Sequence, residues 1–448
     1  MHEKDLTRGP VMKTMALFAL PMILGNILQQ MYNIVDTWVV GRFVGAGALA
    51  AVGSAFALMT FLTSILLGLC MGSGVVFSLC IGQRDEARLE DRLRGAFWLT
   101  AVIAAVLTLA ALFGTDVIIR WLNIPPELRE MTGLYLTIVF CGIPGIFLYN
   151  FFASYLKALG DSVVPLAFLG ISTGSNVFLD LLLVVGFRLG AGGAAAATIA
   201  AQYLAGFGIG IYTLKKDRRV RKALSSRGTS WDGLREIVSY SLLTCIQQSV
   251  MNLGILMVQG LVNSFGTTVM AAFAAATKID AFAYMPAQEY GNAFSTFIAQ
   301  NMGAGEKARV KQGFRYALST SITYCILVSL LLWFLAGQLM GVFIDTGEQA
   351  IIMEGVRYLH IEGVFYCGIG CLFLLYGLYR AMGRPGISVV LTVISLGTRV
   401  LLSYTLSQIP GVGVLGIWWS IPIGWALADL AGLLYFAMKK DRLLCKMI

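Results

Sequence analysis

Four oxygen-bearing side chains in the first half of the sequence have the types and spacing of a small cation site. Asp36 lies in a long apolar run, in "QQMYNIVDTWVVG" (29–41). Asn176 and Asp180, in "NVFLD", are four residues apart, which places both on one face of a helix. Thr198 lies in the next apolar run. Carboxylate, amide and hydroxyl oxygens suit a small hard cation, and two neighbouring carboxylates can share a proton. The pattern predicts a site for a small hard cation or a shared proton.

These four side chains can also lie at a similar depth. Asp36 precedes Arg42 by six residues, about 9 Å of helix, and Asp180 precedes Arg188 by eight, about 12 Å. Thr198 follows Arg188 on the next helix, which runs back. Amides and hydroxyls in membrane helices often only join helices, and a lone acid can belong to an ion pair. Because the first-half helices hold no basic residue at this depth, we favour a functional interpretation.

The composition predicts an integral membrane protein. Hydrophobic residues make up 58% of the 448 residues and charged residues 13%, against about 25% in soluble domains. Mean hydropathy is +0.78. Long apolar runs predict an all-α fold of twelve transmembrane helices, each longer than the roughly 20 residues that span a bilayer. They lie near 14–40, 50–81, 95–121, 130–158, 163–187, 192–214, 236–264, 268–302, 314–343, 354–382, 386–408 and 412–438.

The two halves of the sequence repeat one another. "GQRDEARLEDRLRGA" (82–96) matches "GAGEKARVKQGFRYA" (303–317), and "CGIPGIFL" (141–148) matches "CGIGCLFL" (367–374). Six helices per half give a parallel repeat, as in several transporter folds. We therefore predict an N-lobe over 1–214, a cytoplasmic linker over 215–235 and a C-lobe over 236–448.

The basic residues predict the orientation. Most of the 33 Lys and Arg residues lie in loops on one side of the predicted bundle, and cytoplasmic loops carry this excess. Those predicted on the other side are Arg42, Arg120, Arg129, Arg188 and Arg357. We therefore expect a multi-pass plasma-membrane protein with both termini cytoplasmic. The same placement explains the net charge of +9 without a nucleic-acid partner. The expected partners are membrane lipid and a small-molecule drug or metabolite. The chain is expected to be monomeric.

Enzyme motifs are absent from the sequence. The only histidines are His2 and His360, and there is no phosphate-binding GxxxxGK[ST] loop. A two-lobe membrane protein without a nucleotide site is typical of a secondary transporter, for which no cofactor beyond a coupling ion is expected. A membrane-embedded enzyme or a receptor is the alternative from another class.

The second half does not duplicate the acid cluster. Under the repeat, Asp36 corresponds to Met257 and Asn176 to Arg399. The acids of this half are Asp280, Glu289 and Glu362, and either ion pairing with Lys278 and Arg399 or substrate contact fits them. The side chains predicted to line a substrate cavity are Gln30, Asn33, Asn150, Gln248 and Glu289. Pro21 is predicted to bend the first helix, as a hinge or as a static kink.

Two segments resemble the multidrug and toxic compound extrusion (MATE) family. They are "FALPMILGNILQQMYNIVDTWVVGRFVGAGALAAVG" (18–53) and "STFIAQNMGAGEKAR" (295–309). The resemblance implies two lobes around a V-shaped cavity, with export driven by inward movement of Na⁺ or H⁺. In the DinF-like branch the cation site resembles Asp36, Asn176, Asp180 and Thr198, and Pro21 matches a proline whose bending is linked to protonation. The NorM-like branch carries an acid on its seventh helix, and residues 237–263 contain none.

The sequence thus predicts an antiporter that exchanges amphipathic organic compounds, mainly cations, for H⁺ or Na⁺. The alternative within transport is a lipid-linked oligosaccharide flippase of the related superfamily.

Overall fold

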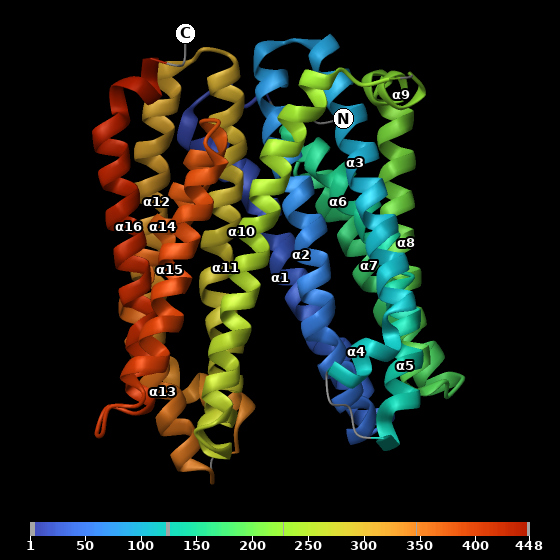
Figure 1. Ribbon diagram of the computed structural model, residues 1–448, viewed down its shortest axis with the longest axis vertical. Helices are drawn as coiled ribbons and strands as arrows, with labels where there is room; N and C mark the ends of the chain where they lie inside the picture. The colour runs from blue at the N-terminus through green and yellow to red at the C-terminus, as the bar shows by residue number, and fades with distance from the viewer. Residues whose placement is uncertain (1–4, 122–125, 227, 346, 446–448) are drawn as a thin grey trace. The chain divides into compact units, whose positions relative to one another are not determined.

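The computed structural model describes residues 5–121, 126–226, 228–345 and 347–445, and helices account for nearly all of them (Figure 1). No β-strand occurs within these ranges. The helices are α1 (Val11–Phe43), α2 (Ala46–Gln83), α3 (Glu86–Phe113), α4 (Thr115–Trp121), α5 (Pro126–Phe140), α6 (Ile143–Ala158), α7 (Val163–Asp180), the π-helix η1 (Leu181–Gly186), α8 (Gly190–Lys216), α9 (Arg218–Ser225), α10 (Trp231–Asn263), α11 (Thr267–Gly303), α12 (Lys307–Phe343), α13 (Gln349–Val364), α14 (Tyr366–Ala381), α15 (Pro385–Leu406) and α16 (Val414–Cys445).

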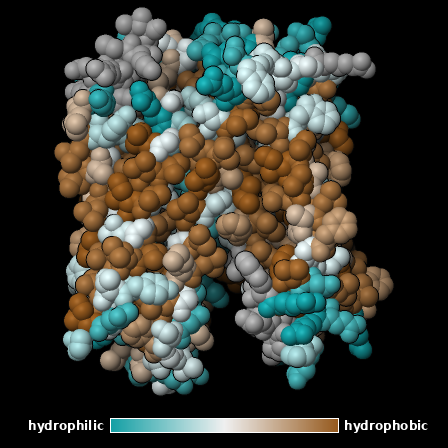
Figure 2. Space-filling model, in the orientation of Figure 1, coloured by the Kyte–Doolittle hydropathy of each residue, from teal (hydrophilic) through white to brown (hydrophobic). Residues whose placement is uncertain are grey.

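The all-α membrane fold expected from the sequence is confirmed. In the described part of the chain, ten helical stretches are long and apolar enough to cross a membrane, and the pair α13 and α14, bent by 53°, would make eleven. α11 is 37 residues long but carries Lys278, Asp280 and Glu289 inside it, which keeps it out of that count. With α11 included, the helices correspond to the twelve predicted spans. Figure 2 shows apolar side chains over the middle of each half and polar ones toward the ends.

The chain divides into two compact units. The first unit contains Leu24–Cys245, and the second contains Leu6–Ile23 and Ile246–Ile448. α1 and α10 therefore each contribute residues to both units. The lobe limits drawn from the sequence, 1–214 and 236–448 with the linker 215–235, stay a prediction.

Each unit has its own aromatic core. In the first, the ring of Phe97 lies 5.2 Å from Phe151, and Phe77 packs edge-on against the same ring. In the second, Phe273 stacks on Trp418 with centroids 5.4 Å apart, and Tyr358 meets Trp418 edge-on. Such aromatic pairs add to the stability that burial gives, so each unit has a rigid frame for its polar residues.

The segment before α1 is tied to the start of α12 within the second unit. Leu6 is fully buried, and its N–H donates to Gln300 Oε1 at 3.2 Å. Its carbonyl accepts from Asn301 Nδ2 at 3.2 Å and from Arg309 Nη2 at 3.1 Å. Arg309 Nη1 also donates to the Gly9 carbonyl at 2.7 Å. Arg309 thus binds the chain that leads into α1 through the carbonyl groups of that chain, and we call residues 6–9 the N-terminal strap.

The end of α16 lies at the same end of the second unit. Phe314, one turn after Arg309 on α12, stacks on Phe436 near the end of α16, with ring centroids 5.9 Å apart. The N-terminal strap and the end of α16 therefore meet the same helix end, as an even number of membrane crossings requires.

An equivalent attachment occurs in the first unit, at the matching motif that begins α3. Arg88 and Arg92 form ion pairs of 2.7 and 2.8 Å with Glu236, in the first turns of α10. Asp217, between α8 and α9, attaches the end of α8 to α6, because it accepts a hydrogen bond from the Tyr155 hydroxyl. Burial acts to raise the pKa of the Asp217 carboxyl, but hydrogen bonds from Arg219 and Tyr155 outweigh it and hold that pKa below its usual range.

Replacing Arg309 by alanine should destabilise the protein. The buried Leu6 carbonyl and the strap would lose charge-assisted hydrogen bonds, at a cost of about 1–3 kcal/mol. Thermal unfolding in detergent should show a lower Tm for Arg309→Ala, while Lys215→Ala, an exposed basic residue at the end of α8, should leave Tm unchanged. Equal Tm values for the two variants would mean that the strap contributes no stability.

Candidate functional site

Three helices of the first unit bring the predicted cation ligands together. Asp36 comes from α1, Asn176 and Asp180 from α7, and Thr198 from α8. α7 and α8 are joined by a hydrogen bond from the Ser172 hydroxyl to the Ala201 carbonyl, at 2.9 Å. Asp180 is fully buried, Asn176 is 1% exposed and Asp36 is half-buried.

The backbone changes its winding at Asp180. α7 ends at this residue, and the next six residues form η1. π-Helical turns are rare and occur frequently at functional sites. The change places the buried carboxylate at the junction of two helical geometries, where the regular hydrogen-bond pattern is interrupted.

The carboxyl groups of Asp36 and Asp180 lie close enough to influence each other electrostatically. Asp36 Oδ1 and both carboxylate oxygens of Asp180 are nevertheless buried without a conventional hydrogen-bond partner among the described residues. Neither acid is in an ion pair in that part of the chain. Two adjacent buried carboxylates without a counter-charge are costly, so the pair can be relieved by a proton or a small cation.

Two tyrosines complete the surroundings of this pair, and sequence reasoning missed both. The Tyr32 hydroxyl donates to Thr198 Oγ1 at 3.3 Å and so joins α1 to α8. Tyr32 and Tyr135 both lie within electrostatic range of Asp36 and Asp180. Tyr32 precedes Asp36 by one helical turn, a spacing that could have revealed it. Tyr135 comes from α5, and no local pattern points to it.

Asn176 offers free ligand atoms. Its amide oxygen and nitrogen are both buried and have no hydrogen-bond partner in the described ranges. No group of three or more His, Cys, Asp or Glu side chains in those ranges could hold a metal ion. A cation between the two acids would therefore also need neutral oxygens, and those of Asn176 and Thr198 are of the right type.

The other first-unit residues proposed from the sequence are held by local hydrogen bonds. Asn33 Nδ2 donates to Gln30 Oε1 at 3.2 Å on α1, and Asn150 Nδ2 donates to the Ile146 carbonyl at 2.9 Å on α6. Pro21, in contrast, lies in the part of α1 that belongs to the second unit; α1 is helical from Val11 to Phe43. Its missing N–H removes one backbone hydrogen bond there.

In the second unit, Gln248 on α10 is buried, and Glu289 belongs to a polar chain. Asn292 Nδ2 donates to Glu289 Oε1 at 3.3 Å, and Arg380 Nη2 donates to Asn292 Oδ1 at 2.9 Å. Arg380 is only 4% exposed, although its place in the sequence suggested a loop end. No pattern in the sequence points to a buried guanidinium that binds Asn292, the hydrogen-bond partner of Glu289.

The remaining acids of the second unit form a separate buried cluster. Asp280 Oδ1 accepts a hydrogen bond from the Tyr366 hydroxyl, and Arg399 interacts with both Asp280 and Glu362. The Lys278 amino group instead lies over the Phe343 ring, 5.9 Å from its centroid. Unlike the pair in the first unit, these acids have a guanidinium within electrostatic range.

A helical membrane bundle with two acids close together inside one unit fits a membrane transporter. The chain belongs to the MatE family, whose model matches residues 21–182 and 241–405.

Curated relatives and solved structures agree with this assignment. The chain is 29% identical over 438 residues to "Probable multidrug resistance protein YpnP" of Bacillus subtilis (strain 168), covering 97% of each chain. It is 22% identical over 440 residues to "Multidrug export protein MepA" of Staphylococcus saprophyticus, covering 97% of this chain and 96% of the relative. A structure described as the outward-facing conformation of a multidrug resistance MATE family transporter of the MOP superfamily has the same fold. It gives a TM-score of 0.92 at 22% identity and covers 99% of both chains.

Neutralising one member of the acid pair should stabilise the first unit. Asp180→Asn removes one of two neighbouring carboxylates while keeping the shape of the side chain, and so relieves an uncompensated buried charge. We expect a Tm higher by a few degrees at pH 8 in sodium-free detergent solution. Asp116→Asn, at an exposed acid of α4, should leave Tm unchanged. An unchanged or lower Tm for Asp180→Asn would contradict the uncompensated state of the pair.

Proposed function

We propose that this protein exports amphipathic organic compounds, mainly cations, in exchange for H⁺ or Na⁺ that enters the cell. The observation that supports this most directly is the pair Asp36 and Asp180, buried in one unit without a conventional partner in the described residues. The names of the relatives, which are multidrug resistance and export proteins, support the same substrate class.

In this proposal the coupling ion binds between Asp36 and Asp180, with Asn176 and Thr198 as neutral ligands when the ion is Na⁺. No organic cofactor is required. A ligand shifts a conformational equilibrium only by binding one state more tightly than the other. Neutralising the pair removes the repulsion between the acids of α1 and α7. The state in which these two helices approach most closely is therefore stabilised most.

Pro21 is the proposed hinge of this response. It lies two residues before the point at which α1 passes from the second unit to the first, between Ile23 and Leu24. Because proline removes a helical hydrogen bond, α1 has its least restrained backbone beside this point. A change at Asp36 can therefore alter the direction of the part of α1 that packs in the second unit.

Glu289 is the proposed counter-charge for a cationic substrate. It is half-buried and is oriented by Asn292, which Arg380 holds in turn. The proposed polar contacts besides Glu289 are Gln30, Asn33, Asn150 and Gln248. Methionine and aromatic side chains supply the apolar surface that an amphipathic compound needs.

The proposed setting is the plasma membrane, with a monomer surrounded by lipid and both termini in the cytoplasm. The distribution of Lys and Arg supports this orientation. No observation in the described residues favours a lipid-linked oligosaccharide flippase.

Replacing Asp36 by asparagine should abolish ion-driven transport. Without this carboxylate the site carries less negative charge. We therefore expect it to lose the difference in ion affinity between the two states of the transporter. Purified protein in proteoliposomes should lose uptake of a fluorescent organic cation, while Asp116→Asn, equally an Asp→Asn change, should transport normally. Uptake under separate Na⁺ and H⁺ gradients identifies the ion. Normal ion-driven uptake by a correctly inserted Asp36→Asn protein would remove the mechanism.

Replacing Glu289 by glutamine should weaken transport of cations selectively. Removing the proposed counter-charge should raise KM for a permanently cationic dye about tenfold, equivalent to about 1.4 kcal/mol, with little effect on an uncharged dye. Glu127→Gln, at an exposed acid of α5, is the matched control. Equal loss for charged and uncharged dyes would assign Glu289 a structural role instead.

A further inference from the structure

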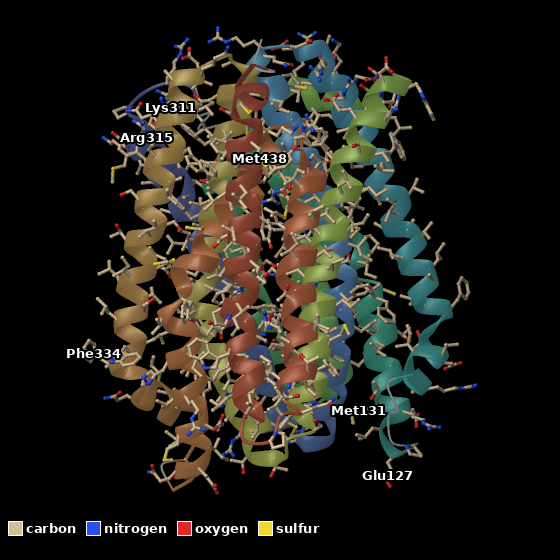
Figure 3. The ribbon with its side chains drawn as sticks, turned by 60° about the vertical axis from the view of Figure 1, so that its left-hand side comes forward. Glu127, Met131, Lys311, Arg315, Phe334 and Met438 are labelled. Atoms are coloured by element: carbon tan, nitrogen blue, oxygen red, sulfur yellow. The ribbon has the colours of Figure 1, made fainter. Side chains whose placement is uncertain are left out.

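The first turns of α12 carry a row of exposed basic side chains. Lys307, Lys311 and Arg315 follow one another at intervals of four residues, so they lie on one side of the helix. None of them is in an ion pair in the described part of the chain. In Figure 3, Lys311 and Arg315 project outward from α12. We call these three residues the α12 basic row.

The row continues into an apolar surface on the same helix. Ile326, Leu330 and Trp333 are 48%, 51% and 51% exposed. At 100° per residue they lie close to the direction of Arg315. Phe334, beside Trp333, projects outward on the same edge of the molecule in Figure 3. A surface with cations at its end and exposed large apolar side chains along its length has the polarity of a phospholipid.

The length of this surface fits one bilayer. Arg315 and Trp333 are 18 residues apart, about 27 Å along a helix, close to the hydrocarbon thickness of about 30 Å. Trp333 stacks on His360 with centroids 4.5 Å apart, and aromatic residues of this kind collect at membrane interfaces. If Trp333 marks one interface, Arg315 and Lys311 lie among the headgroups of the opposite leaflet.

The basic row is separate from the other charged residue of these turns. Arg309 points to the N-terminal strap. It donates hydrogen bonds to the carbonyl groups of Leu6, Arg8 and Gly9. The ring of Phe314 is occupied by Phe436 of α16. Arg309 and Phe314 are thus engaged in contacts within the protein, whereas the three basic side chains of the row are exposed.

We propose that Lys307, Lys311 and Arg315 bind the phosphate of an anionic phospholipid in the inner leaflet, with its acyl chains along Ile326 and Leu330. The leaflet rests on the proposed orientation of the protein. Basic residues near a membrane surface attract anionic lipid by about 1 kcal/mol each, and long basic side chains reach from apolar surface to headgroup. A lipid fits this surface better than soluble phosphate, because the apolar part of the surface would otherwise have no matching group.

Lipid titration with native mass spectrometry tests this proposal. Full-length protein in detergent is titrated with phosphatidylglycerol, and the affinity of the tightest site is compared between variants. Lys311→Gln combined with Arg315→Gln should weaken that site about thirtyfold, which is about 2 kcal/mol at 1 kcal/mol per basic residue. Lys311→Arg combined with Arg315→Lys should retain it.

The matched control removes the same charge elsewhere on the same side. Lys215 and Lys216 are exposed at the end of α8, and their double glutamine variant should keep the site. Equal weakening in both glutamine variants, equal affinity for phosphatidylcholine, or displacement by glycerol phosphate would overturn the proposal. Thermal unfolding confirms that each variant is folded. Lipid binding does not depend on ion coupling, so loss of transport in Asp36→Asn and loss of this site are separate results.

Discussion

The proposed coupling depends most on the repulsion that arises when two neighbouring carboxylates, Asp36 and Asp180, are both charged in an apolar surrounding. In water such a pair costs little, but in a low dielectric two adjacent like charges cannot both persist without a counter-charge. The helices that carry them are fixed by packing, by the Ser172 hydrogen bond between α7 and α8, and by the Tyr32 hydroxyl on Thr198. A rigid frame that keeps the acids together makes their charge state the variable part of the site.

The second unit shows what the same fold does without this constraint. α1 and α10 are each 33 residues long, and the same motif begins α3 and α12. The backbone of the repeat is therefore preserved while its polar side chains differ. Arg399 stands where the repeat has Asn176, and its guanidinium lies in the electrostatic surroundings of Asp280 and Glu362. A positive charge at this position disfavours a mobile cation there, so we favour the first unit for coupling.

The sequence predicted those features that depend on local pattern. Apolar runs gave the spans, and the four-residue spacing of Asn176 and Asp180 gave their shared face. Tyr135, Arg380 and the N-terminal strap could not be predicted, because each acts through contacts with residues far away in the chain. Arg380 lies near the end of the predicted helix 354–382, where a basic residue is expected to reach the surface, yet it is buried and donates to Asn292 of another helix in the second unit. The division of α1 between two units is equally invisible to periodicity, since the helix itself is continuous.

That division gives α1 a position unlike that of α7 or α8. Its first part is held in the second unit, where Arg309 binds the strap that leads into it, and its last part carries Asp36 in the first unit. A continuous helix transmits displacement along its axis because its hydrogen bonds resist stretching, whereas it bends where a bond is missing. Pro21 supplies such a point beside the division. An electrostatic change at Asp36 would therefore act on the second unit mainly as a change of helix direction, with the strap as the fixed end against which α1 bends.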